Sequence, residues 1–281
     1  MHRRSLAAIS IAVALVGAGC ASPNSTIAQE AAVATNSPQS TEPIPTTSPS
    51  TTTTSPPVPS TTTTTTEADA PISDQHRTVI ATARSSIGAL VAYHEPDGLP
   101  VGLPHVVPNP HQFGGPLTLM VTEGEIDDAW VKVQLPVRPN GTEAWIPTEH
   151  YALGETFMRA EVDLGRSSVE IFDGDRLISE TQAAIGASET PTPVGIFYVA
   201  AKRRNPPVEQ HLGEWSVVLS SFSEVLDTFS GGLPVIAIHG THNPDAELGE
   251  AISNGCVRVP NEVMQLLAEQ LPLGAPVIVT A

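Results

Sequence analysis

A tract of threonine, serine and proline limits how much of this chain can fold. Residues 21–72 include uninterrupted threonine runs at 51–54 and 61–66, with prolines between them. Such a tract has too little apolar side-chain surface to offset the conformational entropy lost on folding. Proline favours the extended polyproline II backbone, so about fifty residues reach on the order of 150 Å. We therefore expect a linker over residues 21–72 and a folded part from about residue 73.

The first 20 residues have the features of an export signal. A basic start (His2, Arg3 and Arg4) precedes an apolar run over 6–16 that is short for a membrane span. Small residues directly before Cys20 resemble the lipobox of bacterial lipoproteins, in which the cysteine is diacylated. We expect a lipid anchor at Cys20 that holds the exported protein on the outer face of the cytoplasmic membrane. The alternative is an ordinary signal peptide that is cut after a small residue.

Charge and cysteine content exclude several classes of partner. The formal net charge is −17 and the sequence pI is about 4.7, which argues against nucleic-acid binding and against electrostatic adhesion to anionic lipid. The chain has 2 cysteines and no Cys-x-x-Cys motif. We therefore expect no disulfide, no metal and no cofactor. The 281 residues favour two domains.

Residues 73–154 have the pattern of a small β module. Apolar residues alternate over 117–121 and 130–135, and 90–94 is a further candidate strand. Asn140-Gly141 is a strong hairpin signal, and 144–147 is the predicted returning strand. The hairpin resembles a bacterial SH3-like module. Its two interpretations are cell-wall binding and a role in packing or spacing.

The strongest chemical signal is a histidine and a cysteine in the C-terminal part. His239 ends the apolar run Ile236-Ala237-Ile238, and Cys256 follows Gly255 seventeen residues later (256 − 239). A thiol becomes a nucleophile when a base or a positive field favours its thiolate, and histidine is the usual partner. The alternative interpretation is a buried apolar cysteine and a hydrogen-bonded core histidine.

The sequence around this pair resembles the signature of the L,D-transpeptidases, also called YkuD-like domains. The similar segments are 239–244, 252–259 and the upstream loop 190–197, and the resemblance covers 159–281. It implies a mainly β fold, in which the SH3-like module precedes a β-sandwich catalytic domain with one or two short helices. One departure is Asn254, since many members of the family carry a second histidine there.

The pattern over 159–281 predicts mostly strands. We expect them at 160–164, 168–172, 176–178, 182–185, 195–200, 215–219, 234–238 and 277–279. The segment 203–232 is expected to be a long active-site loop or lid around the strand at 215–219. A helix is expected after Pro260, with Asn261 as its N-cap and an apolar face that includes Leu267.

The resemblance also implies roles for individual residues. Cys256 is the expected nucleophile and His239 the general base and acid, oriented by the carbonyl of Gly240. Backbone amides of Gly255 and Cys256 would hold the oxyanion. The remaining candidates are Ser253 and Asn254, which orient the site or shape its turn, and Arg258, which binds a substrate carboxylate or stabilises the loop.

The implied reaction is transfer of a peptidoglycan tetrapeptide stem, through a Cys256 thioester, to an amine of another stem. This gives a 3→3 cross-link for cell wall organisation and cell shape, and makes the site a carbapenem target. Water, a D-amino acid or a protein amine could also accept the acyl group, and water gives an L,D-carboxypeptidase. Two different interpretations are a sortase-like enzyme and a non-catalytic wall-binding lipoprotein. Cys256 and Arg258, two residues apart, argue against the sortase.

Lipidation at Cys20 predicts that the protein incorporates radioactive palmitate in its host bacterium. A secreted, unlabelled product would instead support an ordinary signal peptide.

Overall fold

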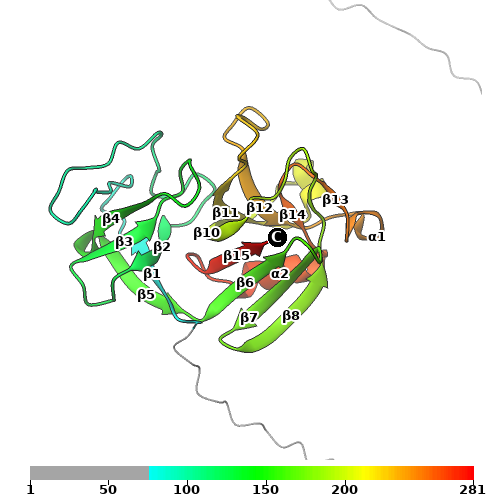
Figure 1. Cartoon of the computed structure of the whole chain (residues 1–281), viewed down its shortest axis with the longest axis horizontal. Helices are drawn as coiled ribbons and strands as arrows, with labels where there is room; N and C mark the ends of the chain where they lie inside the picture. Colours follow the sequence, from blue (N-terminus) through cyan, green and yellow to red (C-terminus); the bar gives the residue numbers. More distant parts are fainter. Residues whose placement is uncertain (1–75) are drawn as a thin grey trace, which may run out of the picture. The chain divides into compact units, whose positions relative to one another are not determined.

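The computed structural model describes residues 76–281 and is drawn in Figure 1. The predicted signal sequence 1–20, with Cys20, and the linker 21–72 lie outside the described residues. Strands make up most of the regular structure, so the predicted mainly β fold is confirmed. Among residues 76–281, no helix is long and apolar enough to cross a membrane.

Residues 76–156, here called the N-terminal unit, form a five-stranded antiparallel sheet in the order β4-β3-β2-β1-β5. Strand β3 alternates as predicted, with Val131 and Val133 buried in the core of the unit. The resemblance to an SH3-like module stays a prediction. The strands are β1 (Thr78–Ala83), β2 (Thr118–Glu123), β3 (Trp130–Gln134), β4 (Glu143–Pro147) and β5 (Tyr151–Thr156), with a 3₁₀ turn at Thr148–His150 before β5.

The predicted strand at 90–94 is wrong. Tyr93 makes only isolated bridges, to Pro100 and to Trp145. Pro100 has no backbone N–H, so it cannot extend the pairing into a ladder. The other two strands of this sheet are β1 and β5, which the sequence pattern did not predict.

Residues 158–281, here called the C-terminal unit, form an eight-stranded sheet and a two-stranded sheet. The large sheet has the order β14-β12-β11-β10-β15-β6-β7-β8, and β9 pairs with β13. The strands are β6 (Met158–Asp163), β7 (Ser168–Asp173), β8 (Arg176–Gln182), β9 (Ile185–Gly186), β10 (Gly195–Arg204), β11 (Trp215–Phe222), β12 (Val235–His239), β13 (Ala251–Ser253), β14 (Val257–Arg258) and β15 (Pro276–Thr280).

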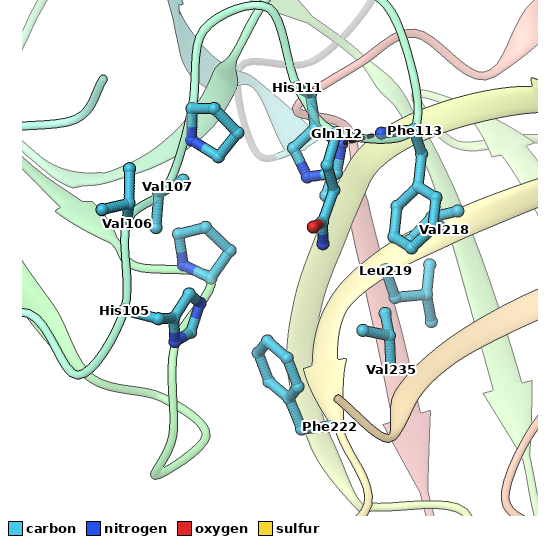
Figure 2. Close-up of a pocket in the computed structure, with 13 residues that line it drawn as sticks. His105, Val106, Val107, His111, Gln112, Phe113, Val218, Leu219, Phe222 and Val235 are labelled. Carbon is cyan, nitrogen blue, oxygen red and sulfur yellow. Dashed lines mark hydrogen bonds between the residues drawn. The ribbon is translucent and has the colours of Figure 1, made fainter. Parts of the chain in front are cut away.

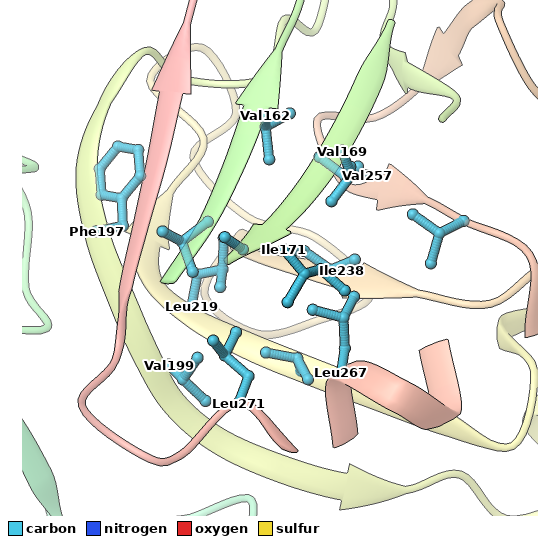
Figure 3. Packing of buried hydrophobic residues seen from close by; sticks show 14 of the residues in the cluster. Val162, Val169, Ile171, Phe197, Val199, Leu219, Ile238, Val257, Leu267 and Leu271 are labelled. Carbon is cyan, nitrogen blue, oxygen red and sulfur yellow. The ribbon is translucent and has the colours of Figure 1, made fainter. Parts of the chain in front are cut away.

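The core of the C-terminal unit lies between the large sheet and helix α2 (Asn261–Gln270). Figure 3 shows Leu267 and Leu271, from α2 and the residue after it, together with Val199, Leu219 and Ile238 of the sheet. A helix buries one stripe of apolar side chains and a strand buries alternate ones, which is why this pair of elements forms a core.

Two sequence predictions about this unit need correction. Asn261 is not the N-cap of α2, since Pro260 occupies that position, and the Asn261 amide instead donates to the Thr241 carbonyl at 2.8 Å. The segment 203–232 is not one long loop, because β10 extends to Arg204 and a 3₁₀ helix, η3, spans Pro207–Leu212. Between β11 and β12, residues 223–234 have no helix or strand.

The two units are joined through strand β10, which is buried on both faces. Phe197 and Val199 pack in the core of the C-terminal unit, whereas Tyr198 and Ala200 pack in the core of the N-terminal unit. Successive side chains of a strand point to opposite faces, so one strand serves both cores.

Two amide side chains of the N-terminal unit reinforce this junction. Gln134 donates to the Ile196 carbonyl at 2.7 Å and accepts from Ser220 Oγ at 2.9 Å. Asn140 donates to the Phe222 carbonyl at 2.8 Å and accepts from the Phe222 amide at 2.9 Å. Asn140, predicted as turn chemistry, therefore also fixes the end of β11, where the segment 223–234 begins.

We predict that Asn140→Ala lowers the free energy of unfolding by about 1–3 kcal/mol, because two backbone groups of Phe222 lose their partner. Denaturation in urea measures the change. Glu143→Gln, at the exposed end of the same hairpin, is the control and is expected to keep wild-type stability within about 0.5 kcal/mol. Equal stability of the two variants would contradict the prediction.

Candidate active site

A cavity of about 780 Å³ lies over one face of strands β11 and β12. Its floor includes Ser216 and Val218 of β11 and Val235, Ala237 and His239 of β12. The predicted residues Cys256, Ser253, Asn254 and Arg258 line the same cavity. The structure thus brings His239 and Cys256 together in one cavity, across the sixteen residues that separate them in the chain.

Parallel pairing of β12 with β14 sets the positions of the two residues. Ile238 pairs with Val257 and His239 with Arg258. Cys256 directly precedes β14, so the same register places it beside Ala237. Because Ile236 and Ile238 point into the core, Ala237 and His239 point into the cavity.

His239 is held by the backbone beside it. Its side chain is buried, and its Nδ1 lies 2.7 Å from the Gly240 carbonyl oxygen. A carbonyl only accepts, so Nδ1 carries the proton and Nε2 keeps its lone pair. Burial lowers the pKa of His239 to about 4; the Gly240 bond opposes this shift and the Arg258 charge adds to it. The imidazole is therefore a neutral base at pH 7.

The Cys256 thiol is also neutral at rest. Burial raises its pKa, although a hydrogen bond with the Ala237 backbone and the positive charge of Arg258 work in the opposite direction. A neutral, half-buried thiol and a neutral imidazole in one cavity are not a preformed thiolate–imidazolium pair. A nucleophilic role for this thiol would require a positioned base that takes its proton.

Ser253 shapes the turn that presents Cys256. Its hydroxyl accepts from the Gly255 amide at 3.1 Å and donates to the Cys256 carbonyl. Gly255 has φ of +106°, and a Cβ there would lie 2.9 Å from Ile236 Cδ1. Glycine is therefore required at this position by both backbone conformation and space. Asn254, between them, is exposed toward the cavity.

The loop at 190–193 is hydrogen-bonded to this turn. Thr190 Oγ1 donates to the Ser253 carbonyl at 3.0 Å, and the Ala187 amide donates to the same oxygen at 2.9 Å. Thr192 is buried, and its hydroxyl accepts from the Gly186 amide at 2.9 Å. Thr190 thus connects the Thr-Pro-Thr-Pro segment to the cysteine turn, and Thr192 connects it to β9, which pairs with β13.

Arg258 is paired with an acidic residue that the sequence pattern did not single out. Its Nη1 lies 3.0 Å from Glu247 Oε1, and Thr241 Oγ1 donates to Glu247 Oε2 at 2.5 Å. Burial alone would raise the pKa of the Glu247 carboxyl, but these two hydrogen bonds outweigh it and lower the pKa. Arg258 Nε is buried without a partner among the described residues. Only the folded chain reveals Glu247, which lies in the short helix α1 (Pro244–Glu247).

Asn261 packs directly against the Gly240 peptide that orients His239. A Cβ at Gly240 would lie 2.0 Å from Asn261 Oδ1, and the Asn261 amide donates to the next carbonyl, that of Thr241. The predicted N-cap residue thus braces the segment after His239.

The cavity also contains residues that the sequence did not single out. Arg203 and Glu209 form an ion pair at its wall, and His211 lies near enough to His239 to affect its pKa by charge. Gln112 and Phe113 reach the cavity from the N-terminal unit. Among residues 76–281, no group of three His, Cys, Asp or Glu residues is arranged to hold a metal ion.

The family model that matches this chain covers the C-terminal unit. Residues 158–279 match the family model of the L,D-transpeptidase catalytic domain, YkuD. The chain is 30% identical over 122 residues to YkuD of Bacillus licheniformis, covering 43% of this chain and 65% of that protein. It is 30% identical over 118 residues to YkuD of Bacillus subtilis strain 168, covering 42% and 63%. The match thus spans just under two thirds of these relatives.

Solved structures show a weaker likeness. A mutant L,D-transpeptidase of Enterococcus faecium is 23% identical, covers 44% of this chain and 49% of its own, and has a TM-score of 0.34. L,D-transpeptidase 3 of Mycobacterium tuberculosis, in complex with a faropenem-derived adduct, is 15% identical, covers 59% and 91%, and has a TM-score of 0.36. At these values the solved structures add nothing to the sequence match.

The buried neutral imidazole predicts loss of stability in mild acid. The pKa of His239 is about 4 in the folded protein and near 6.5 when unfolded, so the unfolded chain binds the proton more readily. The contribution of His239 is complete above pH 6.5, decreases steadily as the pH falls from 6.5 to 4, and changes no further below 4. At pH 4.5 the wild type should have lost about 2–3 kcal/mol of unfolding free energy that His239→Asn does not lose.

Urea denaturation at pH 7.5 and 4.5 measures this difference. His94→Asn, on the exposed surface, is the matched control and should keep the wild-type pH dependence. The same pH dependence in His239→Asn as in the wild type would contradict the prediction.

Proposed function

We propose that the chain is an L,D-transpeptidase that acts on peptidoglycan stem peptides through a thioester on Cys256. One observation carries the proposal. His239 and Cys256 line one cavity, and His239 Nδ1 is held by the Gly240 carbonyl, which leaves Nε2 free to accept a proton. The match of residues 158–279 to the L,D-transpeptidase catalytic domain supports the reaction class.

Acylation starts from the two neutral groups and proceeds in two steps. His239 Nε2 takes the thiol proton as Cys256 Sγ attacks the carbonyl carbon between stem residues three and four. His239 then gives this proton to the nitrogen of the leaving D-Ala as the C–N bond breaks. The products are a thioester on Cys256, a free D-Ala amine and a neutral imidazole, ready for the second half of the reaction.

The negatively charged oxygen that forms on the attacked carbonyl needs hydrogen-bond donors that have no other partner. Of the two amides proposed for this role, that of Gly255 already donates to Ser253 Oγ at 3.1 Å. It can serve only if Ser253 releases it, so the amide of Cys256 is the stronger candidate. Arg258 Nε, buried without a partner among the described residues, supports a role for Arg258 in binding a substrate oxygen.

Deacylation determines the product. A side-chain amine of a second stem that loses its proton to His239 and attacks the thioester forms the 3→3 cross-link. Water at the same position gives a carboxypeptidase, a D-amino acid gives exchange, and a protein amine attaches a protein to the wall. In every case Cys256 recovers its proton from His239 as the thioester breaks.

The proposed location is the outer face of the cytoplasmic membrane. A lipid at Cys20 and a linker over 21–72 would let the folded part reach into the cell wall. The partners are then the stem peptides and the membrane, without nucleic acid. A wall-binding role of the N-terminal unit is part of the same proposal.

A non-catalytic wall-binding lipoprotein is the second candidate, and the raised pKa of Cys256 is the observation that favours it. A buried protonated thiol reacts slowly with simple alkylating agents whether or not it is a catalyst. Reactivity toward such agents therefore cannot distinguish the two. An acylating ligand that occupies the cavity can.

We predict that the chain from residue 21 onward forms a stoichiometric covalent adduct with meropenem, measured by intact mass. Cys256 is the single cysteine in this chain, so one adduct reports on one site. Cys256→Ala should form no adduct. His239→Ala should form it at least about a hundredfold more slowly, since general-base catalysis contributes about 10²–10⁴-fold.

His242→Ala is the matched control, because His242 is exposed on the loop after β12 and does not line the cavity. It should react like the wild type. A folded, reduced wild type that forms no adduct would favour the wall-binding candidate.

A further inference from the structure

The floor of the cavity has a direction that the strand register defines. Ser216 pairs with His239 at one end, Val218 with Ala237 in the middle, and Phe222 with Val235 at the other end. Cys256 lies beside Ala237, near the middle of this floor. A substrate bound over the floor therefore extends from Cys256 toward His239 and toward Val235.

The two ends of the cavity differ in charge. Arg203 pairs in register with Ser216, so the ion pair of Arg203 and Glu209 lies at the His239 end, as does Arg258. At the Val235 end the lining side chains carry no charge; they are Gln112, Phe113, Phe229, Leu233 and Val235. A charged substrate group that is buried against these uncharged side chains without a partner would cost several kcal/mol of binding free energy. Amide and aliphatic groups of a substrate do not carry this cost.

The leaving group has to lie at the charged end. His239 gives its proton to the leaving amine, so that amine is on the His239 side of Cys256. The acyl part of the substrate then extends in the opposite direction, over Ala237 toward Val235. Both arginines of the charged end are paired with carboxylates, Arg203 with Glu209 and Arg258 with Glu247, and Arg258 Nε is the donor there without a partner among the described residues. This donor suits the free carboxylate of a leaving amino acid, and the acyl part meets the uncharged wall.

Part of this uncharged wall belongs to the N-terminal unit. Figure 2 shows Phe113 beside Val218 and Leu219 of β11, with Gln112 next to it on the same loop. A smaller hollow lies between this loop and the ends of β11 and β12, and Phe222 and Val235 also line it. The loop therefore adjoins the floor from Val218, near its middle, to Val235 at the end remote from His239.

The loop is braced internally, so its side chains are presented from a defined backbone. Asn109 donates to the carbonyls of Arg84 and Ile87 at 3.0 and 2.8 Å and accepts from the Leu117 amide at 3.0 Å. The His111 amide donates to the Gly115 carbonyl at 2.9 Å, which closes the tip that carries Gln112 and Phe113.

We infer that Phe113 and Gln112 form a specificity-determining subsite for the uncharged N-terminal part of the acyl-donor peptide. Phe113 supplies an apolar surface for aliphatic groups, and the Gln112 amide supplies a donor and an acceptor for peptide groups. The N-terminal unit thereby completes the substrate site, whether or not this unit binds the cell wall. This inference rests on the proposed transpeptidase function.

The test uses release of D-Ala from two synthetic tetrapeptide stems by the full-length chain. One stem has an acetylated N-terminus, which is uncharged, and the other a succinylated N-terminus, which is negative. Phe113→Ala should raise KM for the acetyl stem about tenfold with kcat within about twofold, and Phe113→Leu should restore part of the loss. Gln112→Arg should shift the preference about tenfold toward the succinyl stem.

Two controls separate this subsite from the catalytic groups and from stability. Leu99→Ala removes an apolar side chain of the same unit that is 78% exposed and does not line the cavity, and it should leave KM unchanged. The rate at which the meropenem adduct forms should stay within about twofold of the wild-type rate in Phe113→Ala, Phe113→Leu and Gln112→Arg. This compact ligand does not need the subsite that Phe113 and Gln112 form.

The outcomes distinguish the inference from the function on which it rests. Wild-type release of D-Ala with the same KM in Phe113→Ala, and the same stem preference in Gln112→Arg, would overturn the subsite and leave the transpeptidase proposal intact. No release by the wild type would overturn both. Should Phe113→Ala fail to fold, Gln112→Arg still decides, because Gln112 is exposed.

Discussion

The alternation of side chains along β10, β11 and β12 is the constraint on which the rest of the structure depends. In each strand one face packs in the C-terminal core, with Val199, Leu219 and Ile238 as examples. The opposite face of β10 packs in the N-terminal core, and the opposite faces of β11 and β12 form the cavity floor. A slip of one residue in β12 would exchange Ile238 with His239, placing an imidazole in the core and an isoleucine in the site. The core therefore fixes the register that the chemistry needs.

Electrostatics at the site follow from the same burial. The His239 imidazole and the Cys256 thiol are both kept neutral, because the charged forms lose solvation next to the core. The charge of Arg258, which is paired with Glu247, favours the neutral imidazole and opposes the neutral thiol without outweighing the effect of burial. The resting site thus holds a neutral imidazole and a neutral thiol, and in the proposed mechanism the thiol proton moves as the substrate carbonyl is attacked. The Gly240 carbonyl, rather than a carboxylate, orients the imidazole, and the carboxylate of Glu247 favours the imidazolium only through its charge.

The junction between the two units links stability to the site. Gln134 and Asn140 use amide side chains to pair backbone and hydroxyl groups at β10 and β11, and the loop with Gln112 and Phe113 reaches the cavity beside them. Buried amides specify geometry because each unpaired donor or acceptor would cost about 1–3 kcal/mol. The N-terminal unit is therefore held in one position against the strands that form the cavity floor.

The sequence by itself determined the mainly β class, most strands of the C-terminal unit and the candidate pair His239 and Cys256. These features depend on local signals: alternation of apolar residues, glycine at turns, and a short motif around a reactive residue. Strands β1 and β5, the role of Asn261 and the contacts of Asn140 depended on partners far away in the chain, as did Glu247 beside Arg258 and the approach of Phe113 to the cavity. Only the tertiary structure decided these, because a hydrogen bond, an ion pair or a cavity wall is defined by two segments whose separation in sequence carries no information about their distance in space.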